Sequence, residues 1–392
     1  MNTLPISLYE VMSLGLGNDT WQQFVDRYEE KYNVADIDGF EFAPLQLSYT
    51  FQQLIAETGA YALPAYVDPE SPGYEAALRE IQGKTGNIPT MKKFYRLNRT
   101  VVRDRLQLIQ QVGRAALSPE MAATFTQLVD EGTDGLIGSF MNALTHQRQQ
   151  IVSTGKFIIN DTNNPRGLQG IEIDFLDDTH RSALAGTKRW WTSDTYETEG
   201  TASDPIKDIK DEVREIRNTY HFYGALHVEV SQALYDALLM HSAVLKRVGY
   251  LLYPTSSTDA VAISAAQNLA DAQIAEALNR LCGVRIVPKD SYAFVDVADT
   301  DAHDIVTKQV ASFDGNNVAF VPDGKIGDIM GTAPLTTGYE PDKVAYYNGG
   351  RLVLTQRAVP ETHSLYIESE AAQLCVPAAT KGMFILTVVA AK

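Results

Sequence analysis

The 392-residue sequence has little of what marks several large classes of protein. It contains only two cysteines, Cys282 and Cys375, which lie far apart and in no metal-binding spacing, so we expect two buried thiols in a reducing compartment. It has no run of about 18 apolar residues, so no membrane-spanning helix is predicted. The first 20 residues contain no basic residue and no cleavage motif of a secretory signal. These absences predict a cytoplasmic origin.

Basic residues are also scarce, because 33 lysines and arginines stand against 49 aspartates and glutamates and give a net charge of −16. A chain this acidic is expected to bind nucleic acid weakly, since affinity for phosphate comes mainly from basic contacts. The charges are unevenly distributed: residues 84–114 hold eight basic residues and one acid, whereas residues 194–215 hold eight acids and three basic residues. Blocks of opposite charge suit contact between neighbouring copies of the chain. Two separate solvated faces remain the alternative.

The stretch "EIQGKTG" at residues 80–86 contains the triplet that closes the phosphate-binding loop of nucleotide hydrolases. That loop needs a further glycine five positions before Gly83, where this sequence has Leu78, and a buried strand, where "YEAALRE" is helical or turn-like. Asp296, in "YAFVDV", resembles a magnesium-binding aspartate at the end of a strand, but short apolar runs before an aspartate are common. We therefore place the triplet at the tip of a loop and predict no nucleotide hydrolysis.

No other group of residues predicts a catalytic, metal or cofactor site. The seven histidines include no pair at i, i+4 helical spacing with a carboxylate between, and no G-x-S-x-G elbow of a serine hydrolase is present. Asp177-Asp178, and Asp130-Glu131 with Asp134, have the chemistry to bind an ion, although solvated faces explain them better. Trp190-Trp191 has the chemistry to stack a base, although packing between strands explains it better. We expect a protein that is not an enzyme and needs no cofactor.

Hydrophobic periodicity and turn residues predict an α+β chain. After a loose N-terminal lead, "WQQFVDRYEEKY" (21–32) predicts a short amphipathic helix. Prolines and glycines over residues 61–89 mark turns. "FYRLNRTVVRDRLQLI" (94–109) predicts a long strand, and "ALPAYV" (62–67) its antiparallel partner. A long hairpin follows from this, with the turn residues and the GKT triplet at its tip.

A helix of about thirty residues is predicted over 119–152, with Ser118 as its N-cap. It would be about 45 Å long, and so needs a broad sheet or a neighbouring subunit to lie against. Three glycines inside it, Gly132, Gly135 and Gly138, each cost roughly 1 kcal/mol relative to alanine and favour a bend.

The rest of the chain changes character near residue 335. Residues 204–335 predict alternating helices and strands, including one helix from Ser231 to Gly249 and another over about 263–282 that ends at Gly283. The tail predicts consecutive strands in "VAYYNGGRLVLTQRAVP", "HSLYIESEAAQLCVP" and "GMFILTVVA", with Asn348-Gly349-Gly350 as a hairpin turn.

The order of these parts resembles the major capsid proteins of tailed bacteriophages, in the Hong Kong 97 fold, and most of all the phage lambda-type major capsid protein E family. The stretches that carry the resemblance are "LIGSFMNALTHQRQQIVSTGKFII" (136–159), "SDPIKDIKDEVREI" (203–216), "LNRLCGVRIVPKDSYAF" (278–294), "NNVAFVPDGKIGDIMGTAPL" (316–335) and "LTQRAVPETHSLYIESEAAQLCVP" (354–377). The resemblance implies five parts: an N-terminal arm (1–55), an extended β-hairpin loop (56–106), a peripheral domain with a spine helix and β-sheet (107–203, helix 119–152), an inserted α/β axial domain (204–339), and the return strands of the peripheral domain (340–392).

The resemblance also implies a function. The protein would be the major capsid protein of a tailed double-stranded DNA bacteriophage, self-assembling into the hexamers and pentamers of an icosahedral head in the bacterial host cytoplasm and located in the virion. Its implied partners are further copies of itself, scaffolding, portal and decoration proteins where these exist, and packaged DNA in weak contact, with no membrane. A nanocompartment shell protein of the same fold and, from a different class, a phosphate- or nucleotide-binding enzyme are the alternatives.

The two charge blocks supply candidate contacts between copies. The basic candidates, assigned to the hairpin, are Lys92, Lys93, Arg96, Arg99, Arg103 and Arg105; the acidic candidates are Asp208, Asp211, Glu212 and Glu215. The hairpin would lie across the next subunit with its basic stem against acidic surface there. Exposed ion pairs contribute about 0.2–1 kcal/mol each, so they would set the register, whereas apolar burial would supply most of the adhesion.

Overall fold

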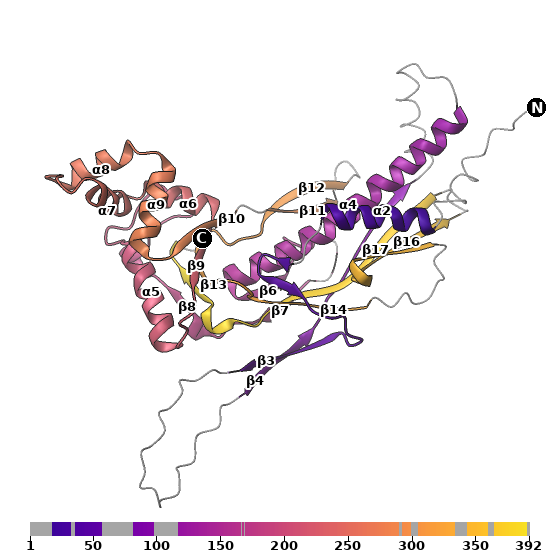
Figure 1. Cartoon of the computed structure of the whole chain (residues 1–392), viewed down its shortest axis with the longest axis horizontal. Coiled ribbons are helices and arrows are strands. Elements are labelled where there is room, and N and C mark those ends of the chain that lie inside the picture. Colours follow the sequence, from indigo (N-terminus) through magenta and orange to yellow (C-terminus); the bar gives the residue numbers. More distant parts are fainter. Residues whose placement is uncertain are drawn as a thin grey trace, which may run out of the picture.

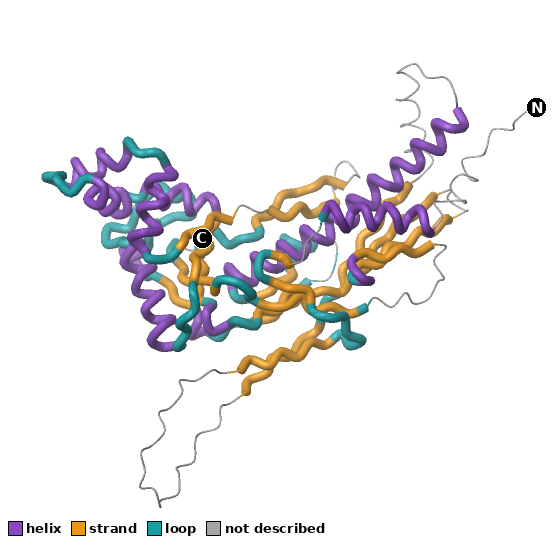
Figure 2. The backbone as a smooth tube through the Cα atoms, viewed as in Figure 1, coloured by secondary structure: helices purple, strands orange, loops and turns teal. Residues whose placement is uncertain are grey.

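The molecule is elongated, with a lobe of helices at one end and a long helix lying along strands towards the other (Figures 1 and 2). The computed structural model describes residues 18–32, 36–56, 81–97, 117–165, 167, 169–289, 292–298, 305–333, 343–359 and 364–389. The helices of this part are α2 (Asn18–Lys31), α4 (Leu117–Thr154), α5 (Pro205–Thr219), α6 (Gln232–Met240), α7 (Ser242–Leu252), α8 (Asp259–Gln267) and α9 (Asp271–Cys282). Among the described residues, no helix is both long and apolar enough to cross a membrane.

A seven-stranded sheet runs beneath α4 and forms one of two hydrophobic cores. Its strand order is β1-β2-β14-β17-β16-β15, and β5 also pairs with β17. The strands are β1 (Asp36–Ile37), β2 (Phe40–Phe42), β5 (Thr90–Leu97), β14 (Gly327–Thr332), β15 (Lys343–Tyr347), β16 (Leu352–Val359) and β17 (Ser364–Pro377). Apolar residues of α4 such as Leu136 and Leu144 are buried in the same core as Ile367 and Leu374 of β17. As predicted, the turn Asn348-Gly349-Gly350 joins β15 to β16, and all three residues have positive φ.

The three glycines of α4 explain how a long helix lies so close to this sheet. A Cβ atom at Gly135 would lie 2.8 Å from the hydroxyl of Tyr95 on β5, and one at Gly132 would lie 3.4 Å from the side chain of Ile367. Gly138 approaches the hydroxyl of Tyr32 in the same way. The helix continues through all three, so Gly132 and Gly135 serve close packing against the sheet, and Gly138 serves close packing against Tyr32, rather than a break in the helix.

The second core lies in the α/β lobe, which we define as α5 to α9 with a five-stranded sheet. The strand order of this sheet is β10-β9-β13-β18-β8. Its strands are β8 (Arg181–Ala183), β9 (Leu226–Ser231), β10 (Arg285–Lys289), β13 (Asn317–Pro322) and β18 (Phe384–Thr387). Trp190, Ile209 and Val228 are fully buried in this core. One strand differs from the expected arrangement: β18, assigned to the peripheral return strands, pairs with β13 and β8 in the lobe.

Three two-stranded ribbons complete the described part. They are β3 (Thr50–Ala56) with β4 (Ile81–Asn87), β6 (Lys156–Ile159) with β7 (Ile171–Asp174), and β11 (Tyr292–Ala298) with β12 (Ile305–Ala311). The β3–β4 ribbon extends away from the body of the molecule (Figure 1). The GKT triplet lies inside β4, where Lys84 is opposite Gln53, so its expected place at a loop tip was wrong. Gly86, next to the triplet, is opposite Phe51, and its lack of a side chain leaves room for that ring, since a Cβ atom there would lie 2.6 Å from it.

The strand predicted over 94–109 also has a different partner. In the described residues it begins earlier, at Thr90, and β5 pairs with β17 of the large sheet along its whole length. The partner proposed at 62–67, and the continuation beyond Leu97, lie outside the described residues. Three of the basic candidates therefore lie in a central sheet rather than in the stem of a hairpin.

The helix predicted from Ser231 to Gly249 is two helices. His241 has extended backbone between α6 and α7, and its ring nitrogen Nδ1 accepts a hydrogen bond from the Ala243 amide, 3.2 Å away, as the N-cap of α7. Gly249 lies within α7 instead of ending it. A glycine is needed there because α8 packs closely against α7: a Cβ atom at this position would lie 2.1 Å from the Ala262 carbonyl oxygen. The helix predicted over 263–282 is likewise divided into α8 and α9, and α9 ends at Gly283 as predicted.

Candidate functional site

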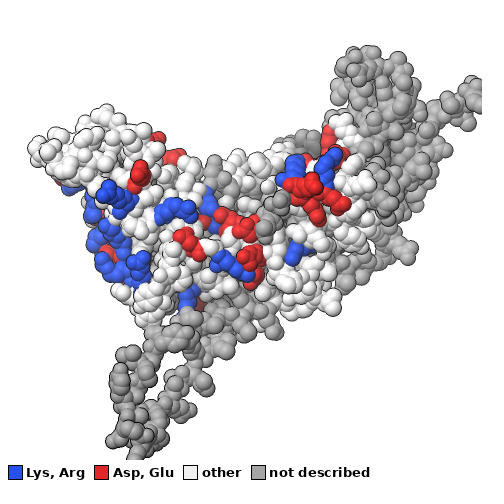
Figure 3. Space-filling model, viewed as in Figure 1, with Lys and Arg blue, Asp and Glu red and all other residues white. Residues whose placement is uncertain are grey.

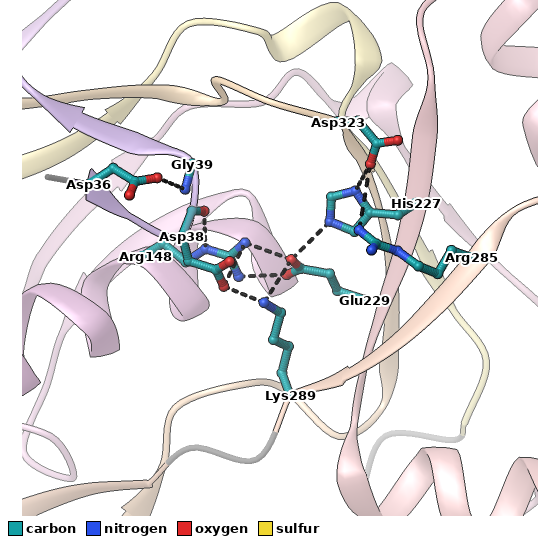
Figure 4. Close-up of polar contacts among 9 residues, drawn as sticks. All are labelled: Asp36, Asp38, Gly39, Arg148, His227, Glu229, Arg285, Lys289 and Asp323. Carbon is teal, nitrogen blue, oxygen red and sulfur yellow. Dashed lines mark hydrogen bonds and ion pairs between the residues drawn. The ribbon is translucent and has the colours of Figure 1, made fainter. Parts of the chain in front are cut away.

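A buried ion pair joins the long helix to the α/β lobe (Figure 4). The two terminal nitrogens of Arg148 on α4 each donate to one oxygen of Glu229 on β9, both at 2.6 Å. The side chains are 1% and 0% exposed. Two parallel charge-assisted hydrogen bonds fix both the distance and the angle between the groups. The pair therefore sets how the lobe sits on the helix.

Charged groups from three further segments surround this pair (Figure 4). Lys289 on β10 approaches Glu229 at 3.3 Å and also pairs with Asp38, in the turn between β1 and β2. Asp38 in turn lies 3.3 Å from Arg148. His227 lies between two carboxylates, 3.2 Å from Glu229 and 2.6 Å from Asp323. We call Arg148, Glu229, Lys289, Asp38 and His227 the ionic junction.

The pKa of Glu229 reflects the hydrogen bonds and charges that surround it in the junction. Burial alone would raise the pKa of its carboxyl, but hydrogen bonds from His227 and Arg148 and the charges of Arg148 and Lys289 lower this pKa to about 2. A hollow of about 190 Å³ lies beside the junction and is lined by Arg148, His227 and Lys289 among others. Its charged lining residues are each paired with one another, with Glu229 or with Asp323. The arrangement is suited to holding elements together and offers no free group for acid–base chemistry.

One further cluster contains the residue types of a serine hydrolase. Ser203 Oγ lies 3.1 Å from His241 Nε2, and Glu199 lies 4.0 Å from His241 Nδ1. However, Nδ1 accepts the amide of Ala243, so the proton is on Nε2 and is donated to the serine. The hydroxyl of Ser203 donates to the Gly200 carbonyl at 2.7 Å. A histidine that donates to the serine cannot act as its base, so this cluster is a helix cap.

The remaining enzyme-like motifs have structural roles. Asp296 pairs with Lys93 at 3.1 Å and accepts from the Thr307 hydroxyl at 3.2 Å, both within the chain. Trp190 and Trp191 are 0% and 2% exposed, which confirms packing over base stacking. In the described part of the chain, no group of three His, Cys, Asp or Glu residues is placed to hold a metal ion.

The acidic residues of α4 hold α2 in place. Asp130 pairs with Arg27 at 2.7 Å and accepts the Tyr28 hydroxyl at 2.7 Å. One turn further on, Asp134 pairs with Lys31 at 2.9 Å and accepts the Tyr32 hydroxyl at 2.8 Å. The two ion pairs therefore join successive turns of α4 to successive turns of α2. Asp130 and Asp134 are used in these contacts, so they form neither an ion site nor a purely solvated face.

The basic interface candidates that the structure describes are engaged within the chain. Lys92 pairs with Glu370 of β17 at 3.0 Å, and Lys93 with Asp296 of β11. Arg96 donates to the Ser364 hydroxyl at 3.2 Å and lies over the ring of Tyr366. Arg99, Arg103 and Arg105 lie outside the described residues. Two members of the basic block thus hold β5 to β17, and a third, Lys93, holds β5 to the β11–β12 ribbon.

The acidic candidates lie on α5 and divide between two faces. Asp208 accepts from the indole of Trp190 at 2.9 Å, and Glu212 accepts from the Ser182 hydroxyl at 3.2 Å, so both point towards the lobe. Burial raises the pKa of the Glu212 carboxyl to about 7. Asp211 and Glu215 are exposed beside Arg214, which lies 3.0 Å from Asp211. Within the described part of a single chain, none of these acids pairs with Lys92, Lys93 or Arg96. Contact between these acids and the basic block of a neighbouring copy stays a prediction.

Comparisons with known proteins agree with this architecture. A sequence profile of the family described as phage major capsid protein E matches residues 45–388. A prophage protein of E. coli CFT073, assigned as a capsid protein, is 13% identical with a TM-score of 0.50, and the match covers 95% of this chain and 99% of that one. A phage-related protein of Bordetella bronchiseptica RB50 is 14% identical with a TM-score of 0.46, covering 94% and 96% of the two chains. No curated protein sequence matches the chain.

The prophage structure shares the fold, which confirms the predicted α+β Hong Kong 97-type architecture. The family match extends from the segment before the β3–β4 ribbon to the end of the lobe. It therefore includes the whole five-stranded sheet, the large sheet except β1 and β2, and the ionic junction except Asp38. The chain therefore belongs to the phage major capsid protein E family and is a structural shell protein of a phage head, not an enzyme.

Proposed function

We propose that this chain builds the icosahedral head of a tailed double-stranded DNA phage by forming hexamers and pentamers in the bacterial host cytoplasm. The feature that supports this best is the β3–β4 ribbon, a two-stranded sheet that extends away from the body of the molecule (Figure 2). An isolated two-stranded ribbon is marginally stable in water and gains stability only against another surface. A neighbouring copy in the shell supplies such a surface.

The rest of the molecule gives the ribbon a rigid base. Phe51 of β3 is fully buried and its ring lies 6.1 Å from that of Phe175, which fixes the root of the ribbon to the body. The large sheet also presents an exposed aromatic face: Phe94 on β5 is 58% exposed and lies 5.8 Å from the ring of Tyr366. Exposed apolar groups on a rigid sheet suit burial between subunits. The ribbon and this face together would give heterologous contacts that close into rings.

The remaining parts of the proposal follow from charge and family. The net charge of −16 suits a shell that touches packaged DNA only weakly, because few basic groups are available to hold phosphate. Scaffolding, portal and decoration proteins are proposed partners where the phage encodes them. The division into an arm, an extended loop, a peripheral domain and an axial domain also remains a proposal, with β18 moved to the axial part.

The test is to express the chain alone, separate it by size exclusion, and image the fractions by negative stain. We expect closed particles or hexameric rings. A discrete 43.2 kDa monomer at all concentrations, with no assembly on concentration or with added scaffold, would contradict the proposal.

A further inference from the structure

The exposed face of α5 carries more positive charge than its sequence suggests. Lys207, Lys210, Arg214 and Arg217 are exposed on this helix, against two exposed acids, Asp211 and Glu215. The other two acids of α5 are turned towards the lobe, as described above. Figure 3 shows lysines and arginines gathered over this end of the lobe. We call these four residues the α5 basic row.

The row is only partly neutralised by its own chain. Lys207 lies 3.9 Å from Asp211, and Arg214 lies 3.0 Å from the same carboxylate. Among the described residues, Lys210 and Arg217 have no ion-pair partner. The helix dipole favours Arg217, which lies in the last turn of α5, but it disfavours Lys207 in the first turn and does not account for Lys210 in the second. Lys210 and Arg217 therefore leave positive charge on this face available to a partner outside the chain.

The opposite charge lies on another side of the same lobe. The loop 192–203, α6, and residues 271–279 of α9 contain six acids and no lysine or arginine. The six are Asp194, Glu197, Glu199, Asp236, Asp271 and Glu276. We call this the acidic side.

Three contacts show that the acidic segments lie together. The loop reaches the end of α6, where Glu199 accepts from the Ser242 amide at 2.9 Å. Tyr196 in the loop lies beside Gly315, to whose carbonyl it donates at 2.9 Å, and Gly315 lies next to Ser231, the cap of α6. Helix α6 also contacts α9. In agreement, the pKa of Tyr235 on α6 is raised by burial and by the charges of Asp236 and Asp271.

The two surfaces lie on different elements of the lobe. The basic row lies on the exposed face of α5, whereas the acidic side lies on the loop 192–203, on α6 and on the first part of α9, and Figure 1 shows α5 and α6 in different parts of the lobe. A molecule with a basic surface on one side and an acidic surface on another is complementary to a second copy of itself in head-to-tail order. Such a contact repeats around a ring, whereas a two-fold contact would place each surface against its own kind.

We infer that the α5 basic row of one copy contacts the acidic side of the next copy, so that the lobes meet head to tail within each ring of the shell. This inference rests on the proposed function, and it names the surfaces by which the lobes meet. It also replaces the earlier expectation that acids at 208–215 receive the basic stem of a hairpin. Positively charged residues of the row are then covered in the shell and are not available to the packaged DNA.

The test is a charge reversal with a compensating reversal. Lys210→Glu with Arg217→Glu removes two cations that hold no ion pair in the chain, and we expect the share of chain in rings or particles to fall about tenfold or more. Adding Glu197→Lys and Asp236→Lys restores the complementarity, so the fourfold variant is expected to regain assembly. Lys188→Glu with Lys308→Glu is the matched control. Both lysines are exposed and lie outside α5, and the two substitutions change the net charge by the same amount as the Lys210/Arg217 pair.

Circular dichroism and thermal melting of each variant separate a folding defect from an assembly defect. Wild-type yield from the Lys210/Arg217 variant overturns the inference, and so does a folded fourfold variant that stays unassembled. Normal particles that retain less DNA also overturn it, since the row would then face the genome. If the wild-type chain forms no rings or particles, the proposed function itself is wrong and the inference falls with it.

Discussion

The ionic junction and the α5 basic row use the same chemical groups for opposite purposes. In the junction, Arg148 and Glu229 are almost fully buried and each is satisfied by the other. In the row, Lys210 and Arg217 are exposed and, within the described residues, have no ion-pair partner. Buried charges are tolerated only when they are paired, whereas exposed charges cost little to leave free. The difference indicates that one set of charges fixes the fold of a single chain and the other is reserved for contact between chains.

The largest expected effect comes from removing one member of the junction. Arg148→Leu leaves the Glu229 carboxylate buried without its main partner, so we expect the free energy of unfolding to fall by about 3–5 kcal/mol. The measurement is urea unfolding of the unassembled chain. Arg148→Met with Glu229→Met is the control, because replacing both charges with apolar groups is expected to recover most of the loss. Equal destabilisation by the single and double variants would show that the pair is not energetically coupled.

Acid should weaken the junction in a defined range of pH. The pKa of Glu229 is about 2 in the folded chain against an ordinary 4.5, so its contribution is complete above pH 4.5 and is lost as the pH falls towards 2. At 1.36 kcal/mol per pKa unit, the contribution is about 3 kcal/mol. Comparing wild type with Glu229→Gln isolates this group from other carboxylates. We expect the stability difference between them to shrink steadily below pH 4.5; a constant difference would contradict the assignment.

The ionic junction is a part of the structure that the local sequence did not predict. The long helix over 119–152, α5, the cap at Gly283 and the hairpin at residues 348–350 follow from periodicity and turn chemistry, and the structure has them. Arg148 and Glu229 are 81 positions apart, and neither belongs to a motif. One signal was present: Glu229 interrupts the apolar strand "LHVEV", and a charge in a buried strand requires a partner.

The errors of prediction have the same origin in tertiary contacts. The basic residues at 92–96 suggested an exposed hairpin, but β5 is held in the large sheet by eight residue pairs with β17. Counting acids over 194–215 suggested one acidic surface, but half of the acids of α5 face inwards. Charge counted along a sequence does not show which side of a helix carries it. The helical period of α5 could have shown which acids face inwards. Asp208 and Glu212 are four residues apart, on one side of the helix, and adjoin the buried Ile209 and Val213.

Glu212 is half-buried, and so lies between the buried charges of the ionic junction and the exposed charges of the α5 basic row. Burial raises the pKa of its carboxyl to about 7, so below pH 4.5 it is neutral in both states and carries no penalty. Between pH 4.5 and 7 the unfolded chain ionises this carboxyl while the folded chain holds its proton, so stability falls over this range and the penalty is complete above pH 7. We expect Glu212→Gln to stabilise the chain at pH 8 by about 1 kcal/mol, a modest value because water screens the partly exposed carboxyl. At pH 4.5 the variant and wild type should melt together.

A matched substitution tests this assignment. Glu215 lies on the exposed face of the same helix, so Glu215→Gln should change stability equally little at both pH values. The readout is the difference in melting temperature between pH 8 and pH 4.5 for each variant. If Glu215→Gln and Glu212→Gln behave alike, the position of Glu212 beneath the helix is not responsible for its pKa.

The smallest expected effect on the single chain belongs to the basic row. Lys210→Ala with Arg217→Ala removes no ion pair within the described residues, so the free energy of unfolding should stay within about 0.5 kcal/mol of wild type. Urea unfolding of the unassembled chain measures it, alongside the Arg148→Leu variant under the same conditions. A loss above about 1 kcal/mol would mean that these cations already stabilise the lobe from within. The row would then be part of the fold, like the junction, and the division between charges that hold one chain together and charges kept for its neighbours would not hold.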